Sequence, residues 1–170
     1  MAISYSFKWL PLLLAAASLI TIVSADQALI NSICSKTRNQ ALCFQVFQNS
    51  ASADRGGLGI TSTNVAWIKA QATLSLVNSL GRKEHDPRIK GQYRTCADAY
   101  SNALDMLREC KTFFGKNDFS TANVRASAAD TDVDTCSNDG TSVAPELKAA
   151  NQENGDYIAI VLAVSNVSSV

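Results

Sequence analysis

The sequence has few of the residues that carry most enzyme chemistry. Its 170 residues include one histidine, His85, and five cysteines with no C-x-x-C spacing, and they contain no P-loop, GxGxxG or HExxH pattern. Metal centres and nucleophile–base pairs need such clusters. His85 lies in the polar segment "GRKEHD", where a solvated loop residue is expected. We therefore expect no catalytic site, no metal site and no cofactor.

Carboxylates occur close together only in an acidic run. Asp130, Asp132 and Asp134 are spaced two residues apart in a segment that is predicted to be helical. Residues at i and i+2 of a helix do not share a face. The run is therefore interpreted as solvated or capping residues and not as an acid–base pair.

An excess of one charge is also absent. Lys+Arg and Asp+Glu each number 15, charged residues make up 18% of the chain, and no long run of like charge or basic patch is seen. Nucleic-acid and anionic-membrane binding normally show such a bias. Neither is expected as the main partner.

Long apolar runs are missing after the first 25 residues. "WLPLLLAAASLITIV" follows Lys8 and precedes small residues at Val23 and Ala25, which is the pattern of a signal peptide. The run is short for a membrane span, which needs ~20 residues. We predict a signal peptide at 1–25, a mature domain at 26–170, and secretion.

The mature chain has the periodicity of helices and almost no strand-like alternation, which predicts an all-α fold. The first long helix is expected over 59–81, with Thr61 or Ser62 as N-cap and Gly81 at its end. Its apolar residues at helical spacing are Val65, Ile68, Ala72 and Val77.

Three further helices are expected. One begins at Asp86-Pro87 and ends at Gly115. The next is capped by Asn117 or Asp118. The last runs over about 143–164, with a possible break at Asn154-Gly155. "ADRGGLG", "GRKEHD" and "SNDGTS" are interpreted as linkers.

The cysteines of a secreted chain are expected to form disulfides. Cys96 and Cys110 cannot pair, since fourteen helical residues separate them by ~21 Å and a disulfide needs Cα atoms within ~7 Å. In an antiparallel hairpin that turns near Lys116, Cys96 and Cys136 lie at equal distances from the turn. We predict that these two pair and that Cys110 is a free, buried thiol.

Two stripes of residues at steps of three and four support this hairpin. One stripe contains Cys96, Tyr100, Ala103, Leu107, Cys110 and Phe114, and the other contains Phe119, Ala122, Ala126, Ala129, Val133 and Cys136. Small alanines opposite larger side chains let helix axes approach closely. Cys34 and Cys43 remain, and they would close a short loop between two N-terminal helices.

Several segments resemble the plant invertase and pectin methylesterase inhibitor family. They are the C-x-x-T-x5-C spacing of Cys34, Thr37 and Cys43, the run "CADAYSNALDML" from Cys96, and "NDFSTANVRASAADTDVDTC" ending at Cys136. Together they span most of the mature chain, and "ENGDY" resembles the pollen group of this family, which includes a plane-tree allergen. The resemblance implies an up-and-down four-helix bundle with an N-terminal helical hairpin, and the disulfides Cys34–Cys43 and Cys96–Cys136.

The resemblance also implies a function. The chain would be a secreted protein inhibitor of a plant acid invertase (beta-fructofuranosidase) that occludes the active-site cleft in the apoplast or cell wall, with the vacuole as an alternative. We expect a monomer. Some family members place Pro-Lys-Phe at a hairpin tip that enters this cleft, and Asn117, Asp118 and Phe119 occupy that position here. Only the phenylalanine is kept. We take these three residues as the expected target-binding site.

Two other functions remain open. Inhibition of pectin methylesterase would use the sides of the helices, around 61–80 and 87–107. A carrier of an apolar ligand would need a cavity, which the alanine-rich stripes disfavour. Asn166, in Asn166-Val167-Ser168, is the single possible N-glycosylation site.

Overall fold

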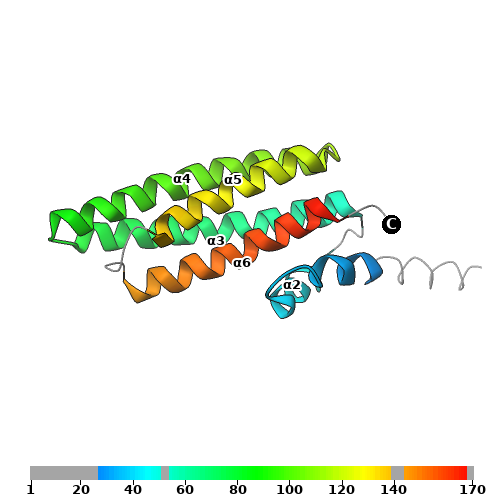
Figure 1. The fold of residues 1–170 in the computed structure, drawn as a ribbon, viewed down its shortest axis with the longest axis horizontal. Coiled ribbons are helices and arrows are strands. Elements are labelled where there is room, and N and C mark those ends of the chain that lie inside the picture. The colour runs from blue at the N-terminus through cyan, green and yellow to red at the C-terminus, as the bar shows by residue number, and fades with distance from the viewer. Residues whose placement is uncertain (1–26, 51–53, 139–143, 168–170) are drawn as a thin grey trace, which may run out of the picture.

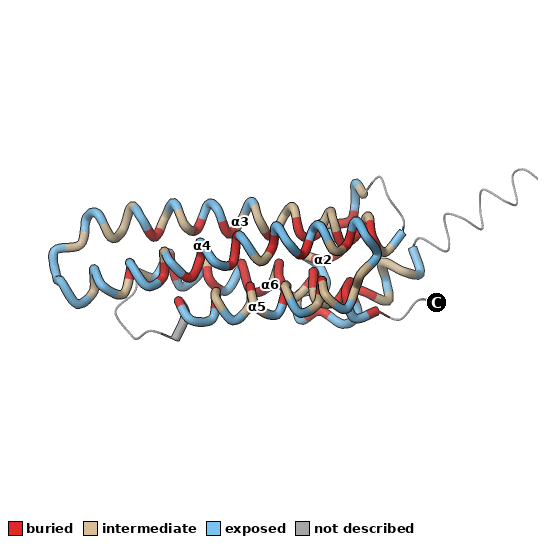
Figure 2. The backbone as a smooth tube through the Cα atoms, turned by 90° about the horizontal axis from the view of Figure 1, so that it is seen from above, coloured by how far each residue is buried: buried red, intermediate tan, exposed pale blue. Residues whose placement is uncertain are grey.

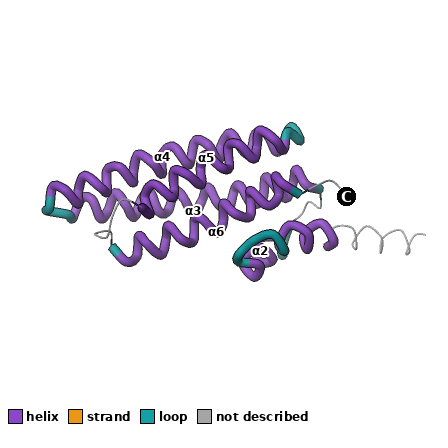
Figure 3. Tube along the Cα trace, viewed as in Figure 1, coloured by secondary structure: helices purple, strands orange, loops and turns teal. Residues whose placement is uncertain are grey.

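The computed structural model describes residues 27–50, 54–138 and 144–167, and helices account for nearly all of them (Figures 1 and 3). Residues 27–34 are helical and lead through a turn into α2. The remaining elements follow in the order α2 (Gln40–Phe47), α3 (Arg55–Lys83), α4 (Pro87–Gly115), α5 (Phe119–Asn138) and α6 (Pro145–Asn166). The described residues contain no strand, in agreement with the predicted all-α class.

The long helices form an up-and-down bundle. α3 packs against α4 and α6, and α5 packs against the same two helices, so each long helix has two neighbours. The buried residues of each helix face the bundle axis (Figure 2). Both predicted hairpin stripes are buried, apart from Phe119, which is half-buried. No helix among the described residues is long and apolar enough to cross a bilayer.

The predicted start of the first long helix is wrong. α3 begins at Arg55 and not near Thr61, and the Asp54 carboxylate caps it by accepting a hydrogen bond from Gly57 N at 2.7 Å. Glycines that suggested a linker therefore form the first turns of this helix. At Gly56, an added Cβ would lie 2.8 Å from Asn117 Oδ1, so the absent side chain leaves room for the α4–α5 turn.

The same helix extends beyond its predicted end at Gly81 and stops at Lys83. By contrast, the ends set by strong local signals are confirmed. Asp86 caps α4, Pro87 is its first residue, and Gly115 is its last. Asp118 is the capping residue before α5, since its Oδ1 accepts from Thr121 N at 3.0 Å.

α6 runs through the predicted break without interruption. Asn154 is buried and its Nδ2 donates to Thr73 Oγ1 of α3 at 2.8 Å. Gly155 lies under the N-terminal hairpin, where an added Cβ would be 2.8 Å from an Arg38 guanidinium nitrogen. These two residues therefore serve tertiary contacts, which explains why a break-like pair stands inside a helix.

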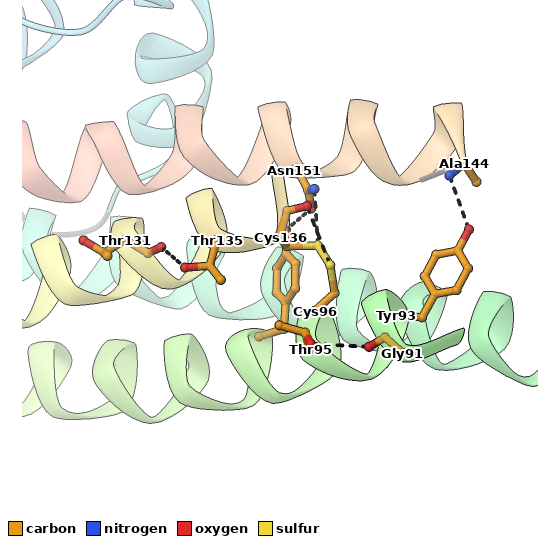
Figure 4. Close-up of a disulfide and its surroundings, with 10 residues drawn as sticks. Gly91, Tyr93, Thr95, Cys96, Thr131, Thr135, Cys136, Ala144 and Asn151 are labelled. Atoms are coloured by element: carbon orange, nitrogen blue, oxygen red, sulfur yellow. Dashed lines mark hydrogen bonds between the residues drawn. A yellow bond between two sulfur atoms is a disulfide. The ribbon is translucent and has the colours of Figure 1, made fainter. Parts of the chain in front are cut away.

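Two disulfides staple the fold. Cys34 and Cys43 join the N-terminal helices, with Cα atoms 5.4 Å apart, and Cys96 and Cys136 join α4 to α5, with Cα atoms 4.7 Å apart. Asn151 of α6 donates to Cys136 Sγ at 3.4 Å, so three helices meet at this bridge (Figure 4). Each bridge stabilises the fold by roughly 2–4 kcal/mol in the loop-entropy model.

Candidate target-binding surfaces

The α4–α5 turn carries the three residues that the sequence analysis placed at the target. Asn117 is exposed and adopts the left-handed conformation, with φ 56°, which asparagine tolerates better than most residues. Its N–H donates to Phe114 O and that of Asp118 donates to Phe113 O, both at 3.0 Å. The turn is thus closed by its own backbone and projects no long flexible segment.

Phe119 does not stand free at this turn. The Arg55 guanidinium lies 3.8 Å from the centroid of its ring, and the Phe114 ring is 6.2 Å away at 58°. Arg55 is held in turn by the end of α6, where it donates to Val164 O at 2.9 Å and to Ser165 O at 2.5 Å. Phe119 is consequently part of a packed junction of α3, α5 and α6.

Phe114 closes the other side of this junction. It is fully buried, and an added Cβ on Gly59 would lie 2.1 Å from its ring. The glycine-rich start of α3 therefore accommodates the tip of the α4–α5 hairpin. Of the tip aromatics, Phe113 is half-buried, and Lys116 Nζ lies 5.8 Å from its ring centroid.

Asp118 has a structural role in this turn. Its pKa is lowered, chiefly by the hydrogen bond from the backbone N–H of Thr121 and then by that of the Thr121 side chain, with a smaller contribution from Lys116. The carboxylate therefore stays ionised while it caps α5. It is half-buried, so part of its surface still faces solvent.

A second candidate surface is an apolar groove between α3 and α4. It has a volume of about 520 Å³, and we call it the α3–α4 groove; its lining includes Thr63, Asn64, Trp67, Ile68, Leu107 and Lys111. Ile68 is 59% exposed there, next to other apolar lining residues, and contiguous exposed apolar surface is typical of interaction sites. Trp67 is half-buried beside it.

Ile68 was expected in the core stripe of its helix, and this expectation is wrong. The buried residues of α3 include Leu58, Ala66, Ala70 and Val77, and Ala72 is exposed. At 3.6 residues per turn, adjacent helical residues point about 100° apart. Trp67 and Ile68 are adjacent large apolar residues at one edge of the buried face, and here Trp67 is half-buried and Ile68 exposed.

Cys110 is buried at the centre of the α4–α5 hairpin. Its Sγ lies 3.3 Å from Ala122 O and 4.0 Å from Thr63 Oγ1. Burial raises the pKa of this thiol to about 11. A protonated and inaccessible sulfur is a poor nucleophile, so Cys110 acts as a packed core residue.

Of the other residues singled out in the sequence, His85 and Asn166 lie on the surface, whereas Asp130 and Asp132 are half-buried and not fully solvated as expected. His85 is exposed between α3 and α4, and Asn166 is exposed at the end of α6, although the serine of its sequon lies outside the described residues. Burial raises the pKa of Asp130 and Asp132. The described part of the chain contains no group of three or more His, Cys, Asp or Glu side chains placed to hold a metal ion.

These features define a class of protein before any relative is considered: a disulfide-stapled helical bundle whose surfaces suit binding to another protein. The family described as "Plant invertase/pectin methylesterase inhibitor" matches residues 28–167. The chain therefore belongs to this family, whose members inhibit enzymes and are not enzymes themselves.

Individual relatives carry both target names. A pectinesterase inhibitor from Actinidia deliciosa is 36% identical over 85% of this chain and 82% of its own length. A protein from Platanus orientalis named "Putative invertase inhibitor" is 30% identical over 69% of this chain and 71% of its own. A crystal structure of a mutant pectin methylesterase inhibitor from Arabidopsis superposes with a TM-score of 0.73 at 30% identity, covering 81% of this chain and 95% of that one.

Proposed function

We propose that the protein is a secreted inhibitor of a pectin methylesterase and that it binds the enzyme through the α3–α4 groove. The observation that carries this proposal is that the aromatic of the α4–α5 turn is covered, whereas apolar side chains of the α3–α4 groove are accessible. Phe119, the aromatic on which invertase binding would depend, is held between Arg55 and Phe114. Ile68 and Trp67 remain available on the side of the bundle.

The groove has the composition of a protein-binding surface. Its lining combines the aromatic Trp67 and the aliphatic Ile68 and Leu107 with the charged Arg108 and Lys111. Such apolar anchors with a polar rim provide most of the binding energy in protein interfaces. A rigid bundle docked by this side would block substrate access without any reactive group of its own.

The similarity to named pectinesterase inhibitors supports the same target. We further propose that residues 1–25 are a signal peptide, that the mature chain acts as a monomer, and that it works in the apoplast or cell wall. In this view residues 26–170 form one inhibitor domain.

The test compares two exposed apolar residues on different helices. Ile68→Glu introduces a charge into the groove, and Val124→Glu does the same on α5, where Val124 is 61% exposed. Both variants should fold, since neither site is in the core. We expect Ile68→Glu to weaken inhibition of a pectin methylesterase at least about tenfold and Val124→Glu to leave it within about twofold. Equal inhibition by both variants would place the contact elsewhere.

Inhibition of an acid invertase is the second candidate, favoured by the Platanus relative and by the partly accessible Phe113 and exposed Asn117 at the turn. Titrating the wild-type protein against both enzymes separates the two targets. Inhibition of invertase alone, lost in Asn117→Ala at unchanged thermal stability, would overturn the pectin methylesterase proposal and support the tip.

A further inference from the structure

The end of the bundle formed by the α3–α4 turn contains a second groove, whose lining includes several charged side chains. It has a volume of about 700 Å³ and lies between the last turns of α3 and the first turns of α4. Arg82, Lys90 and Arg94 line it, together with one carboxylate, Asp98, so its lining carries a net charge of 3 − 1 = +2. We call it the basic groove. All four of these residues are exposed.

Small residues and a fixed floor shape this groove. Gly91 has no atom within 4 Å of where its Cβ would be, and a Cβ on Gly81 would lie 3.2 Å from Tyr93 Cβ. Tyr93 is buried beneath, and its hydroxyl accepts a hydrogen bond from Ala144 N at 3.3 Å, at the start of α6 (Figure 4). The depression is therefore held open by the packing of three helices.

The basic side chains of the groove have no ion-pair partner within 4.0 Å among the described residues. Elsewhere Arg38, Lys69, Arg108 and Arg125 each pair with a carboxylate. The acids nearest in sequence are engaged locally. Glu84 accepts from the backbone N–H groups of His85 and Asp86, and Asp86 accepts from those of Arg88 and Ile89.

This separation of the acidic side chains from the groove cations explains why the sequence showed no basic patch. The chain is neutral overall, and its basic residues are interspersed with acids. Folding brings Arg82 beside the α4 face that carries Lys90 and Arg94, which are one helical turn apart, at about 6 Å. Capping directs two of the local acids towards backbone groups. Residues 82–98 contain five basic and three acidic side chains, and folding gathers three of the basic ones around one groove.

We propose that the basic groove binds an acidic polysaccharide, specifically a polyuronate such as de-esterified pectin. A polyuronate presents carboxylates at regular intervals along an extended chain, and arginine binds carboxylates with two parallel hydrogen bonds. An open groove with charges on both walls suits an extended polyanion better than an enclosed small molecule. The choice of this polyanion rests on the proposed function, because hydrolysis of pectin methyl esters leaves such carboxylates.

The basic groove is separate from the proposed inhibitory surface. Arg82 and Ile68 are fourteen residues apart on α3, which corresponds to about 21 Å along the helix axis. A bound polysaccharide would thus leave the α3–α4 groove free. The protein could be retained on the demethylated polymer close to the enzyme that it inhibits.

The experiment measures binding of the mature chain to immobilised polygalacturonate at low salt, with highly methyl-esterified pectin as the neutral reference. Arg82→Gln/Lys90→Gln/Arg94→Gln removes the groove charges. Lys36→Gln/Lys116→Gln/Lys148→Gln removes three exposed charges that line neither groove. We expect the groove variant to lose at least about tenfold in affinity and the matched variant no more than about twofold.

Three results would overturn the proposal: no binding of wild type to polygalacturonate, equal binding to the esterified polymer, or equal losses in the two variants, which would indicate attraction to net charge alone. Inhibition of pectin methylesterase by the groove variant is measured in parallel, with a short soluble ester substrate. Wild-type protein that binds polygalacturonate but does not inhibit pectin methylesterase would contradict the proposed function while supporting the groove assignment. Retained inhibition with lost polymer binding is the expected pattern.

Discussion

The two turns at opposite ends of α4 are built alike but used differently (Figure 1). Each is three residues long and ends in an aspartate that caps the next helix, Asp86 before α4 and Asp118 before α5. The α4–α5 turn is packed against α3 through Phe114 and Phe119, whereas the α3–α4 turn leaves Arg82 and Lys90 in solvent. Similar capping chemistry therefore produces one turn that is packed against the bundle and one turn whose neighbouring residues are open to solvent.

The difference comes from what faces each turn. The start of α3 offers glycines that accept the aromatic rings of the α4–α5 tip, and Arg55 covers the second ring. The charged residues of the α3–α4 turn face no such surface among the described residues. An aromatic at a hairpin tip is thus not automatically a binding residue, because the bundle itself can be its partner.

Removing the core ring of the packed end should have the largest effect. Phe114→Ala is expected to lower the free energy of unfolding by about 3–5 kcal/mol, since it empties a fully buried site. Urea denaturation measures this loss. Phe113→Ala, at the half-buried neighbouring position, should cost clearly less. Equal costs would mean that the tip is not packed as described.

A matched pair of glycines sharpens the comparison between the ends. Gly59→Ala would place a methyl group 2.1 Å from the Phe114 ring, and overpacking of this kind costs about 1–3 kcal/mol. Gly91→Ala, in the open groove, meets nothing within 4 Å and should stabilise the helix by about 0.5–1 kcal/mol. Melting temperatures should therefore move in opposite directions, and a shift of the same sign would contradict the contrast.

The arginines at the two ends should differ in the same way. Arg55→Gln removes the contact with Phe119 and two hydrogen bonds to carbonyls of α6, which should cost about 1–2 kcal/mol. Arg82→Gln, with no ion-pair partner among the described residues, should change stability by less than about 0.5 kcal/mol. Denaturant unfolding of both variants in one buffer measures these changes in stability. An equal loss of stability in the two variants would refute the predicted difference.

The smallest expected effect concerns pH. The folded-state pKa of Asp118 is lowered by its hydrogen bond from Thr121 N, so its contribution to stability is present above the ordinary aspartate pKa, about 3.9, and is lost as pH falls through the folded value. Asp118→Asn should match wild type at pH 7, because asparagine is an equally good N-cap. Between about pH 5 and 2 the variant should lose less of its melting temperature than wild type. Identical acid profiles would argue against this role.

Part of the candidate site was readable from the sequence. The all-α class and the hairpin register of Cys96 and Cys136 follow from spacing, the family was indicated by the resemblance of several segments, and Phe119 was placed at the α4–α5 turn. Its covering by Arg55 was not foreseen, because those two residues are 64 positions apart (119 − 55). Ile68 was grouped with Val65, Ala72 and Val77 by its helical spacing. This spacing is only approximate, so it does not determine which side of the helix faces the core.

The sequence by itself determined the features that depend on neighbours within one helical turn. Asp86-Pro87, Gly115 and Asp118 set helix ends through their own backbone and capping chemistry, and the helical rise alone kept Cys96 from Cys110. Only the tertiary structure decided which glycines belong to α3, whether Phe119 is covered, and where unpaired cations gather. Those outcomes depend on the surface that each facing helix presents, and that surface is created when the bundle assembles.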